Sequence, residues 1–407
     1  MIDSKNWGRF TAKGSQKVEV LITRMVEEIV TVIADTIPEK HYKCLYMLGG
    51  YGRGEGGVVI VNGQERPHNN FDLMLVANDV KADKADEMKV KIDEALQQLI
   101  ERIGVGIDTS VINASKLKSS SCRMIWYDMK FGHKVLLGNT DIIMSCSQFV
   151  MKKIPAWDAR NLLVNRGTLL IINDLIIKQQ STLDIELKKV IIRHTVKSII
   201  GYGDCLLFFL GEYDWSYIEK QKRMQDRRDL DPEFKKLYDD AMNFRFQPDY
   251  EPFLIKDLTQ WMKEVKQLLQ KINLSCESRR LHRKKLNWDN YINFALAHGM
   301  SEAGLGIKAW GKRLLNYSNM QSEFPGKAPM SIRMGYKFLG DKGVLPLIYP
   351  LIAYNLRNQD YRKIARGFLQ VQNFNFEDLR SAYLKKWGEY MDTNFSHLLK
   401  KFQIKLK

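Results

Sequence analysis

A glycine-rich run is the part of this sequence in which chemistry is most readily expected. Six of the ten residues that follow Leu48 are glycine, and an apolar segment that predicts a buried strand, Cys44–Leu48, comes directly before them. Glycine lacks a Cβ, so its backbone can adopt positive φ angles and bring N–H groups close to an anion. Arg53 adds a positive charge within the run. The run therefore predicts a phosphate-binding turn at the end of a strand.

The segment Phe71–Val76 predicts the next strand and carries a candidate metal ligand. Asp72 is its one acidic residue, and Asn70 precedes Asp72 by two positions, so both side chains face the same side of a strand. Side-chain oxygens on one face beside a glycine turn could hold Mg²⁺, or Mn²⁺ in its place, on the phosphates of a nucleotide.

The glycine run and the acidic strand together resemble the signature of the nucleotidyltransferase superfamily with the DNA-polymerase-β-like fold. In that family a Gly-Gly or Gly-Ser turn precedes an acidic-apolar-acidic strand, and a third carboxylate lies on a later strand, where Asp108 is the candidate here. The segments Lys197–Leu207 and Gly211–Tyr217 resemble the helical C-terminal region of bacterial stand-alone members, which helps to bind the acceptor. The resemblance implies that the triphosphate contacts six consecutive residues: Gly49, Gly50, Tyr51, Gly52, Arg53 and Gly54.

The resemblance also implies roles for acidic residues. Asp72 would bind Mg²⁺, and Asp108 would bind the metal that activates the acceptor hydroxyl or would take the proton of that hydroxyl. Glu55 is either a turn residue or a contact to the acceptor. Arg166 and Asp204 are further candidates for the acceptor side. Arg166 could also reach toward the nucleotide phosphates, and its alternative role is a helix cap or an interdomain ion pair.

Asn70 departs from the family pattern, because it stands where the family has its first metal-binding carboxylate. An amide keeps one oxygen ligand but removes a negative charge, so metal affinity should fall. Asn69 cannot compensate, because on a strand it faces the other way. Three explanations remain open: a natural enzyme that tolerates the amide, a natural protein that binds nucleotide without turnover, and an engineered Asp→Asn substitution that traps substrate.

Composition and length indicate an ordinary globular protein with two or three domains. The chain has 407 residues, of which 45% are hydrophobic and 27% are charged. Its five cysteines are scattered without a CxxC pair, which argues against a zinc site or a disulfide framework and favours a reducing compartment. No apolar run approaches the length of a membrane span, so we expect a cytoplasmic protein without a membrane partner.

The net charge of +16 is unevenly distributed. Residues 1–150 contain equal numbers of acidic and basic residues, so the whole excess lies after them. The densest basic clusters are 220–228 and 279–285, and Trp288 and Tyr291 follow the second. Basic residues interleaved with aromatic ones make RNA a candidate partner of the C-terminal region, while attraction of nucleoside triphosphate and plain solvated helix faces are the alternatives.

The hydrophobic periodicity predicts an α+β fold, with a mixed-sheet N-terminal domain followed by a largely α-helical C-terminal region. The predicted domains are a nucleotidyltransferase catalytic domain at 1–142, a helical acceptor-side domain at 143–325 and a helical subdomain at 326–407. His133, beside a glycine at a predicted turn, is expected to be structural rather than a general base. The predicted elements are helices at 15–36, 81–103, 161–172 and 186–212, strands at 44–48, 71–76 and 107–112, a hairpin at 58–63, and a helix followed by a strand within 122–138.

The leading interpretation is a Mg²⁺-dependent nucleotidyltransferase that moves a nucleoside monophosphate from a nucleoside triphosphate to a hydroxyl acceptor on a small molecule, a protein or an RNA. The alternative is a catalytically silent nucleotide- or RNA-binding module, such as a component of a toxin–antitoxin or defence system. Asn70 favours the alternative, whereas Asp72, Asp108 and the intact glycine run favour the enzyme.

Overall fold

The computed structural model describes residues 6–138, 140–180, 182–302, 307–319, 330–354, 356, 359–372, 375–402 and 404–406. The chain forms two compact units, and both are discontinuous in sequence. The first comprises Met1–Pro155 and Glu212–Asp249, and the second comprises Ala156–Gly211 and Tyr250–Lys407. Residues 143–155 and 212–249, which the sequence interpretation assigned to a helical domain, thus belong to the first unit. The predicted boundary between residues 325 and 326 lies outside the described residues.

A four-stranded sheet organises the first unit and confirms the predicted α+β class. The strand order is β5-β4-β1-β6, with bounds Ile107–Asn113, Phe71–Ala77, Tyr42–Leu48 and Lys134–Leu137. Strand β1 pairs antiparallel with β4 and β6, whereas β4 and β5 run parallel, so the sheet is mixed. The predicted strands at 44–48, 71–76 and 107–112 are therefore present, each extended by one or two residues.

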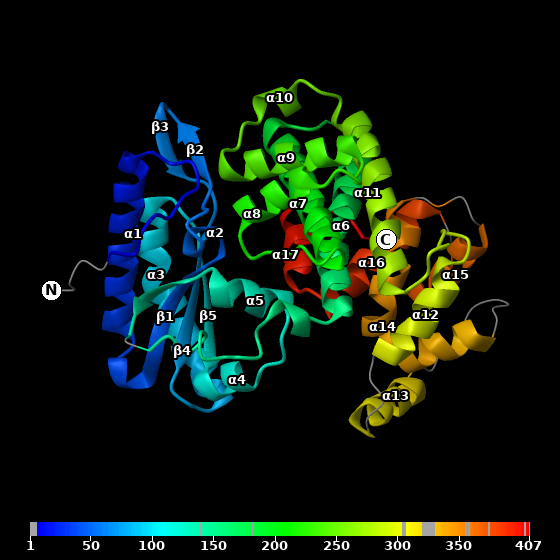
Figure 1. Ribbon diagram of the computed structural model, residues 1–407, viewed down its shortest axis with the longest axis horizontal. Coiled ribbons are helices and arrows are strands. Elements are labelled where there is room, and N and C mark those ends of the chain that lie inside the picture. Colours follow the sequence, from blue (N-terminus) through cyan, green and yellow to red (C-terminus); the bar gives the residue numbers. More distant parts are fainter. Residues whose placement is uncertain are drawn as a thin grey trace. The chain divides into compact units, whose positions relative to one another are not determined.

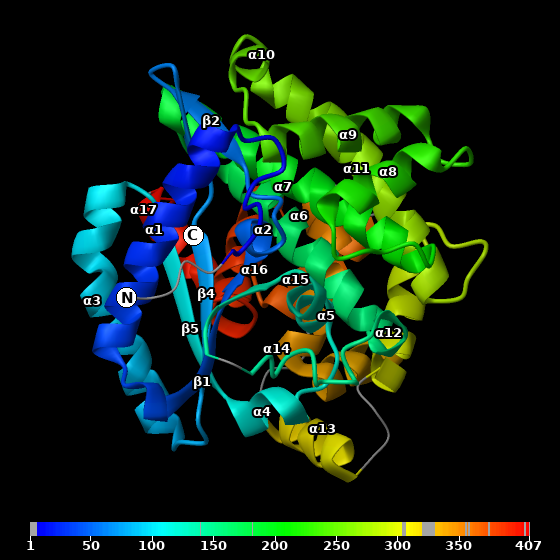
Figure 2. The ribbon, with the colours of Figure 1, turned by 60° about the vertical axis from the view of Figure 1, so that its left-hand side comes forward.

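Two long helices, α1 (Gln16–Thr36) and α3 (Ala82–Ile103), cover one face of this sheet (Figures 1 and 2). Their apolar stripes form one core with the inward-facing side chains of β1 and β4, among them Leu73 and Leu75. Because side chains alternate along a strand, Asp72 points to the opposite face. The core thus fixes the face of the sheet on which Asp72 is presented.

The long connection between the glycine run and β4 contains a second, two-stranded sheet. Strands β2 (Val58–Val61) and β3 (Gln64–Pro67) pair antiparallel. Asn62 and Gly63 join them with φ angles of 50° and 75°, the positive values that a tight two-residue hairpin turn requires. The predicted hairpin at 58–63 is confirmed.

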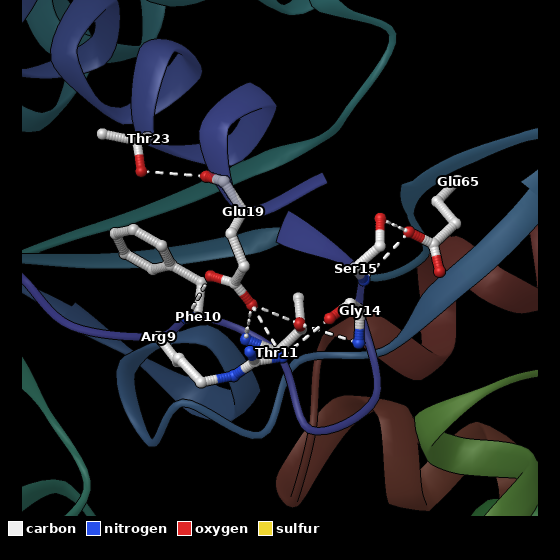
Figure 3. Close-up of polar contacts among 8 residues, drawn as sticks. All are labelled: Arg9, Phe10, Thr11, Gly14, Ser15, Glu19, Thr23 and Glu65. Atoms are coloured by element: carbon white, nitrogen blue, oxygen red, sulfur yellow. Dashed lines mark hydrogen bonds and ion pairs between the residues drawn. The ribbon is translucent and has the colours of Figure 1, made fainter. Parts of the chain in front are cut away.

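A loop before α1 is fixed by one buried carboxylate (Figure 3). Glu19 of α1 accepts hydrogen bonds from the backbone N–H groups of Phe10 (2.8 Å) and Thr11 (3.0 Å) and from the Thr11 hydroxyl. The loop in turn pairs with the glycine run, because the Gly56 N–H donates to the Phe10 carbonyl (2.9 Å). Glu19 therefore holds the backbone that lies against the glycine run.

Helices make up most of the remainder of the chain. The second unit is helical in its described part, as predicted, and no described helix combines the length and the apolar character that crossing a bilayer requires. The first unit also contains α2 (Gly49–Gly52), η1 (Glu39–His41), α4 (Ala114–Ser119), α5 (Met124–Phe131), η2 (Met151–Lys153), α8 (Tyr217–Asp226) and α9 (Pro232–Phe246). The second contains α6 (Ala156–Gln179), α7 (Ile185–Phe209), α10 (Glu251–Leu254), α11 (Leu258–Arg280), α12 (Tyr291–Glu302), α13 (Ile307–Asn319), α14 (Met330–Ala353), α15 (Gln359–Leu369), α16 (Phe376–Tyr390) and α17 (Asn394–Lys401).

Candidate functional site

Two carboxylates lie side by side at the end of the sheet where β4 and β5 begin; this end is called the edge below. In the parallel pairing of β4 with β5, Asp72 is the direct register partner of Asp108. Register partners on neighbouring strands present their side chains on the same face. Asp72 is half-buried, whereas Asp108, on the edge strand, is exposed. A carboxylate pair with one solvent-facing member is thus in place near the start of both strands.

Asn70 joins this pair. Its Nδ2 donates a hydrogen bond to Oδ2 of Asp108, with a donor–acceptor distance of 3.1 Å. A Cβ on Gly106 would lie 2.6 Å from Oδ1 of Asn70, so the absence of a side chain at Gly106 makes room for the amide. The structure therefore brings the three predicted metal ligands to one place, with an amide in contact with a carboxylate.

The glycine turn begins at the same edge. Gly49 follows β1 directly and has a φ of +64°, which L-residues with side chains rarely adopt. A Cβ on Gly49 would lie only 2.0 Å from Oδ2 of Asp72, so the carboxylate occupies the space that a side chain would need. Glycine at this position thus allows both the turn and its contact with Asp72.

The other residues of the run serve mainly to pack the turn. At Gly52, Gly54 and Gly56, an added Cβ would collide with backbone carbonyl oxygens. The buried Tyr51 hydroxyl donates to the Gly57 carbonyl (2.7 Å) and accepts from the N–H of residue 68 (3.0 Å). Burial raises the pKa of Tyr51 to about 12. The Tyr51 side chain therefore ties the two ends of the hairpin arm together.

Arg53, a predicted phosphate contact, has an internal partner. Its Nη2 lies 2.9 Å from Oδ2 of Asp128, and the side chain is almost fully buried. The Tyr213 hydroxyl donates to the same carboxylate at 2.8 Å, and the Tyr217 ring lies 4.7 Å from the guanidinium carbon. Burial alone would lower the Arg53 pKa, but the surrounding acidic and phenolic groups outweigh that effect and raise it. Arg53 thus links the glycine run to α5 and α8.

Glu55 is also occupied within the protein. Its buried carboxylate accepts hydrogen bonds from the Ser216 hydroxyl and from the N–H groups of Tyr217 (2.8 Å) and Ile218 (3.4 Å). These groups form the beginning of α8, where the first N–H groups have no acceptor within the helix. Of the two roles predicted for Glu55, the turn residue is the one that these contacts match.

The remaining predicted side chains contact residues outside the cluster of Asn70, Asp72 and Asp108. Both ring nitrogens of His133 form hydrogen bonds, to the Met129 carbonyl (2.9 Å) and to Asp141 (3.1 Å), which fits a structural role. Arg166 on α6 and Asp204 on α7 belong to the second unit. Asp204 is buried, and the Arg166 stem packs on Gly201. Their assignment to the acceptor side stays a prediction.

The two basic clusters differ in how much charge they present. In 220–228, Lys220 is buried, Arg223 pairs with Asp214 (2.9 Å), and Arg227 pairs with Glu212 (2.6 Å). In 279–285, Arg280 is buried against two carboxylates, whereas the following basic residues are exposed. Both clusters have exposed basic residues, and the second presents them consecutively, at Arg283, Lys284 and Lys285.

Sequence reasoning missed one side chain at the glycine turn. Arg245 of α9 places its Nη2 3.4 Å from the position that a Cβ on Gly50 would occupy. It lies in an amphipathic helix with no motif around it, far along the chain from the glycine run, so no local signal distinguishes it. Only the return of residues 212–249 to the first unit brings it to the turn.

Comparison with known proteins gives no relative: no family model, curated protein or solved structure matches this chain significantly. In the described part of the chain, no three histidine, cysteine, aspartate or glutamate side chains gather closely enough to hold a metal ion.

Proposed function

We propose that this chain is a Mg²⁺-dependent nucleotidyltransferase with a polymerase-β-like site. The observation that carries the proposal is the pairing of Asp72 with Asp108 in register on parallel strands, beside a turn in which Gly49 contacts Asp72. Glycine turn, first acidic strand and second acidic strand thus meet at one edge, which is the arrangement that the sequence resemblance implies. The substrate would be a nucleoside triphosphate, and the acceptor would bear a hydroxyl.

The donor atoms suit the proposed cation. Mg²⁺ prefers oxygen ligands and is usually held by one or two carboxylates together with substrate phosphates, and Asp72 and Asp108 supply two carboxylates. When bound, Mg²⁺ neutralises the charge that develops on the transferred phosphoryl group. The Asp72 carboxylate lies against Gly49 of the turn, while the exposed Asp108 would face the acceptor and take its proton.

A second candidate function is nucleotide binding without turnover, and the hydrogen bond from Asn70 to Asp108 favours it. That bond occupies one oxygen of the carboxylate with an N–H donor. An aspartate at position 70 would instead repel Asp108, and a cation would be required to hold the two together. The amide therefore allows Asn70 and Asp108 to lie together without a metal ion between them. Such an arrangement suits a protein that binds nucleotide without catalysis.

Label transfer distinguishes the two functions. The chain and its Asn70→Asp variant are incubated with each α-labelled nucleoside triphosphate and Mg²⁺, in the presence of total RNA and cell extract. Transfer by the unmodified chain, abolished by Asp72→Asn, supports the enzyme and identifies the acceptor class. Transfer by the Asn70→Asp variant alone supports a silenced site. Turnover that survives Asp72→Asn contradicts the proposed site, and absence of transfer in both proteins contradicts the transferase.

A further inference from the structure

The guanidinium of Arg245 lies beside the glycine turn. Its Nη2 approaches Gly50, the residue next to the one that contacts Asp72. Among the described residues, no carboxylate forms an ion pair with Arg245, and its buried Nε has no hydrogen-bond acceptor. A buried polar group without a partner is costly, and a charged one more so. An anionic ligand at the turn would give this guanidinium a partner of opposite charge through Nη2.

The surroundings of Arg245 fix the plane of its guanidinium. Its carbon lies 3.8 Å from the centre of the Tyr217 ring, which is stacking distance. The same ring has the Lys220 ammonium at 4.3 Å and the Arg53 guanidinium at 4.7 Å. Three cations thus gather around one aromatic ring.

Asp128 and Glu55 form no ion pair with Arg245, because each has other partners. Asp128 is taken by Arg53 and Tyr213, and Glu55 is taken by the first residues of α8. Of the three cations, Arg245 is the one that approaches Gly50. The donor fork of a guanidinium favours phosphate.

We infer that Arg245 binds the phosphates of the nucleotide at the Gly49–Gly50 turn, an inference that rests on the proposed function. Side chains of opposite charge then lie beside two adjacent glycines. Asp72 lies beside Gly49 and would face the metal, and Arg245 lies beside Gly50 and would face the phosphates. Arg245 would then make the phosphate contact that the sequence predicted for Arg53. The Arg53 guanidinium instead pairs with Asp128.

The test measures binding rather than turnover. Isothermal titration with Mg²⁺ complexes of the four nucleoside triphosphates, and with Mg²⁺-tripolyphosphate, is carried out on the chain and on Arg245→Gln, Arg245→Lys and Arg228→Gln. Arg228 is exposed in the same unit and gives a matched change of charge. We expect Arg245→Gln to weaken binding about 10- to 100-fold, the value of a charge-assisted hydrogen bond. Arg245→Lys should be intermediate, and Arg228→Gln should bind as the parent does.

The outcomes separate the two proposals. Binding by the parent with unchanged affinity in Arg245→Gln overturns the inference and leaves the proposed function intact. Failure of the parent to bind any of these ligands overturns both. If near-ultraviolet circular dichroism shows that Arg245→Gln does not fold, Arg245→Lys decides: affinity equal to the parent's in that variant contradicts a fork-shaped contact with phosphate, and a loss supports it.

Discussion

At the edge of the sheet, the amide of Asn70 donates a hydrogen bond where an acidic side chain would bring a third negative charge. This hydrogen bond lets Asn70 lie beside Asp108 without repulsion between like charges. Restoring a carboxylate at position 70 should therefore have two opposite effects. It should raise affinity for a cation, and it should destabilise the protein when no cation is present, because carboxylates that share a site repel one another.

This pair of effects is a prediction for the Asn70→Asp variant. Without divalent cations, its thermal unfolding midpoint should be lower than that of the parent, and Mg²⁺ should raise the midpoint of the variant more than that of the parent. Calorimetric melts with and without millimolar Mg²⁺ measure both. An equal response of the two proteins to Mg²⁺ would mean that position 70 does not face the cation site.

Gly49 gives a second prediction at this scale. Gly49→Ala should abolish nucleotide binding, because the new Cβ would displace the Asp72 carboxylate. Gly63→Ala is the matched control, since Gly63 also has a positive φ but has no atom within 4 Å of the new Cβ. Both substitutions should cost about 1 kcal/mol of backbone strain, yet only Gly49→Ala should affect nucleotide titration. Equal loss in both variants would assign the effect to strain alone.

The residues of the site differ in how far the sequence reveals them. Asp72 and Asp108 stand out because each interrupts an apolar strand pattern, and a regular strand then determines the face on which each side chain lies. From sequence alone, Arg53 and Glu55 are candidate ligands, but in the structure Arg53 pairs with Asp128 and Glu55 accepts hydrogen bonds from α8. These contacts join residues far apart in the chain, so no local sequence pattern reveals them. Arg245 was missed for the same reason.

At the scale of elements, the loop in front of α1 depends on one carboxylate. Glu19→Ala should leave the N–H groups of Phe10 and Thr11 without their acceptor and destabilise the protein by about 2–4 kcal/mol. Glu27→Ala, at an exposed position of the same helix, should change stability by less than about 0.5 kcal/mol. Urea unfolding of the two variants measures the difference. A similar midpoint in both would contradict the anchoring role of Glu19.

The α6–α7 pair should make stability depend on pH. His194 is buried, and its Nδ1 lies 2.9 Å from Oδ1 of Asn173. Burial, with Lys197 and Arg193 nearby, lowers the His194 pKa to about 3. The unfolded chain, whose histidine has a pKa near 6.5, therefore binds more protons than the folded one between these values. The contribution of neutral His194 to the free energy of unfolding is fully present above pH 6.5. Below pH 6.5 it falls by about 1.4 kcal/mol per pH unit, down to the folded-state pKa.

The measurement is urea unfolding of the parent and His194→Gln between pH 7 and pH 4. The parent should lose more stability than the variant as the pH falls. His41→Gln, at an exposed histidine, is the control and should follow the parent. Parallel curves for the parent and His194→Gln would contradict a buried neutral histidine.

At the scale of the whole molecule, the net positive charge belongs to the second unit, because acidic and basic residues balance in the first. If RNA is a partner, the exposed residues Arg283, Lys284 and Lys285 should contribute to its binding. Replacing all three with serine should reduce the slope of log affinity against log salt concentration by about 2 for single-stranded RNA. The matched control replaces Lys17, Lys84 and Lys91, exposed lysines of the first unit. Equal effects would indicate general charge attraction, and no binding at low salt would exclude RNA.

The discontinuity of the first unit has a consequence for synthesis on the ribosome. Asp72 and Asp108 emerge early, but Tyr213, Ser216 and Tyr217, which hold Arg53 and Glu55, are made only after α6 and α7. All strands of the sheet are synthesised early, but the first unit is complete only when residues 212–249 follow the helices α6 and α7 of the other unit. A fragment that ends at Pro155 would keep both carboxylates yet leave the buried Arg53 and Glu55 without these partners. We expect such a fragment to fold incompletely and to be prone to aggregation.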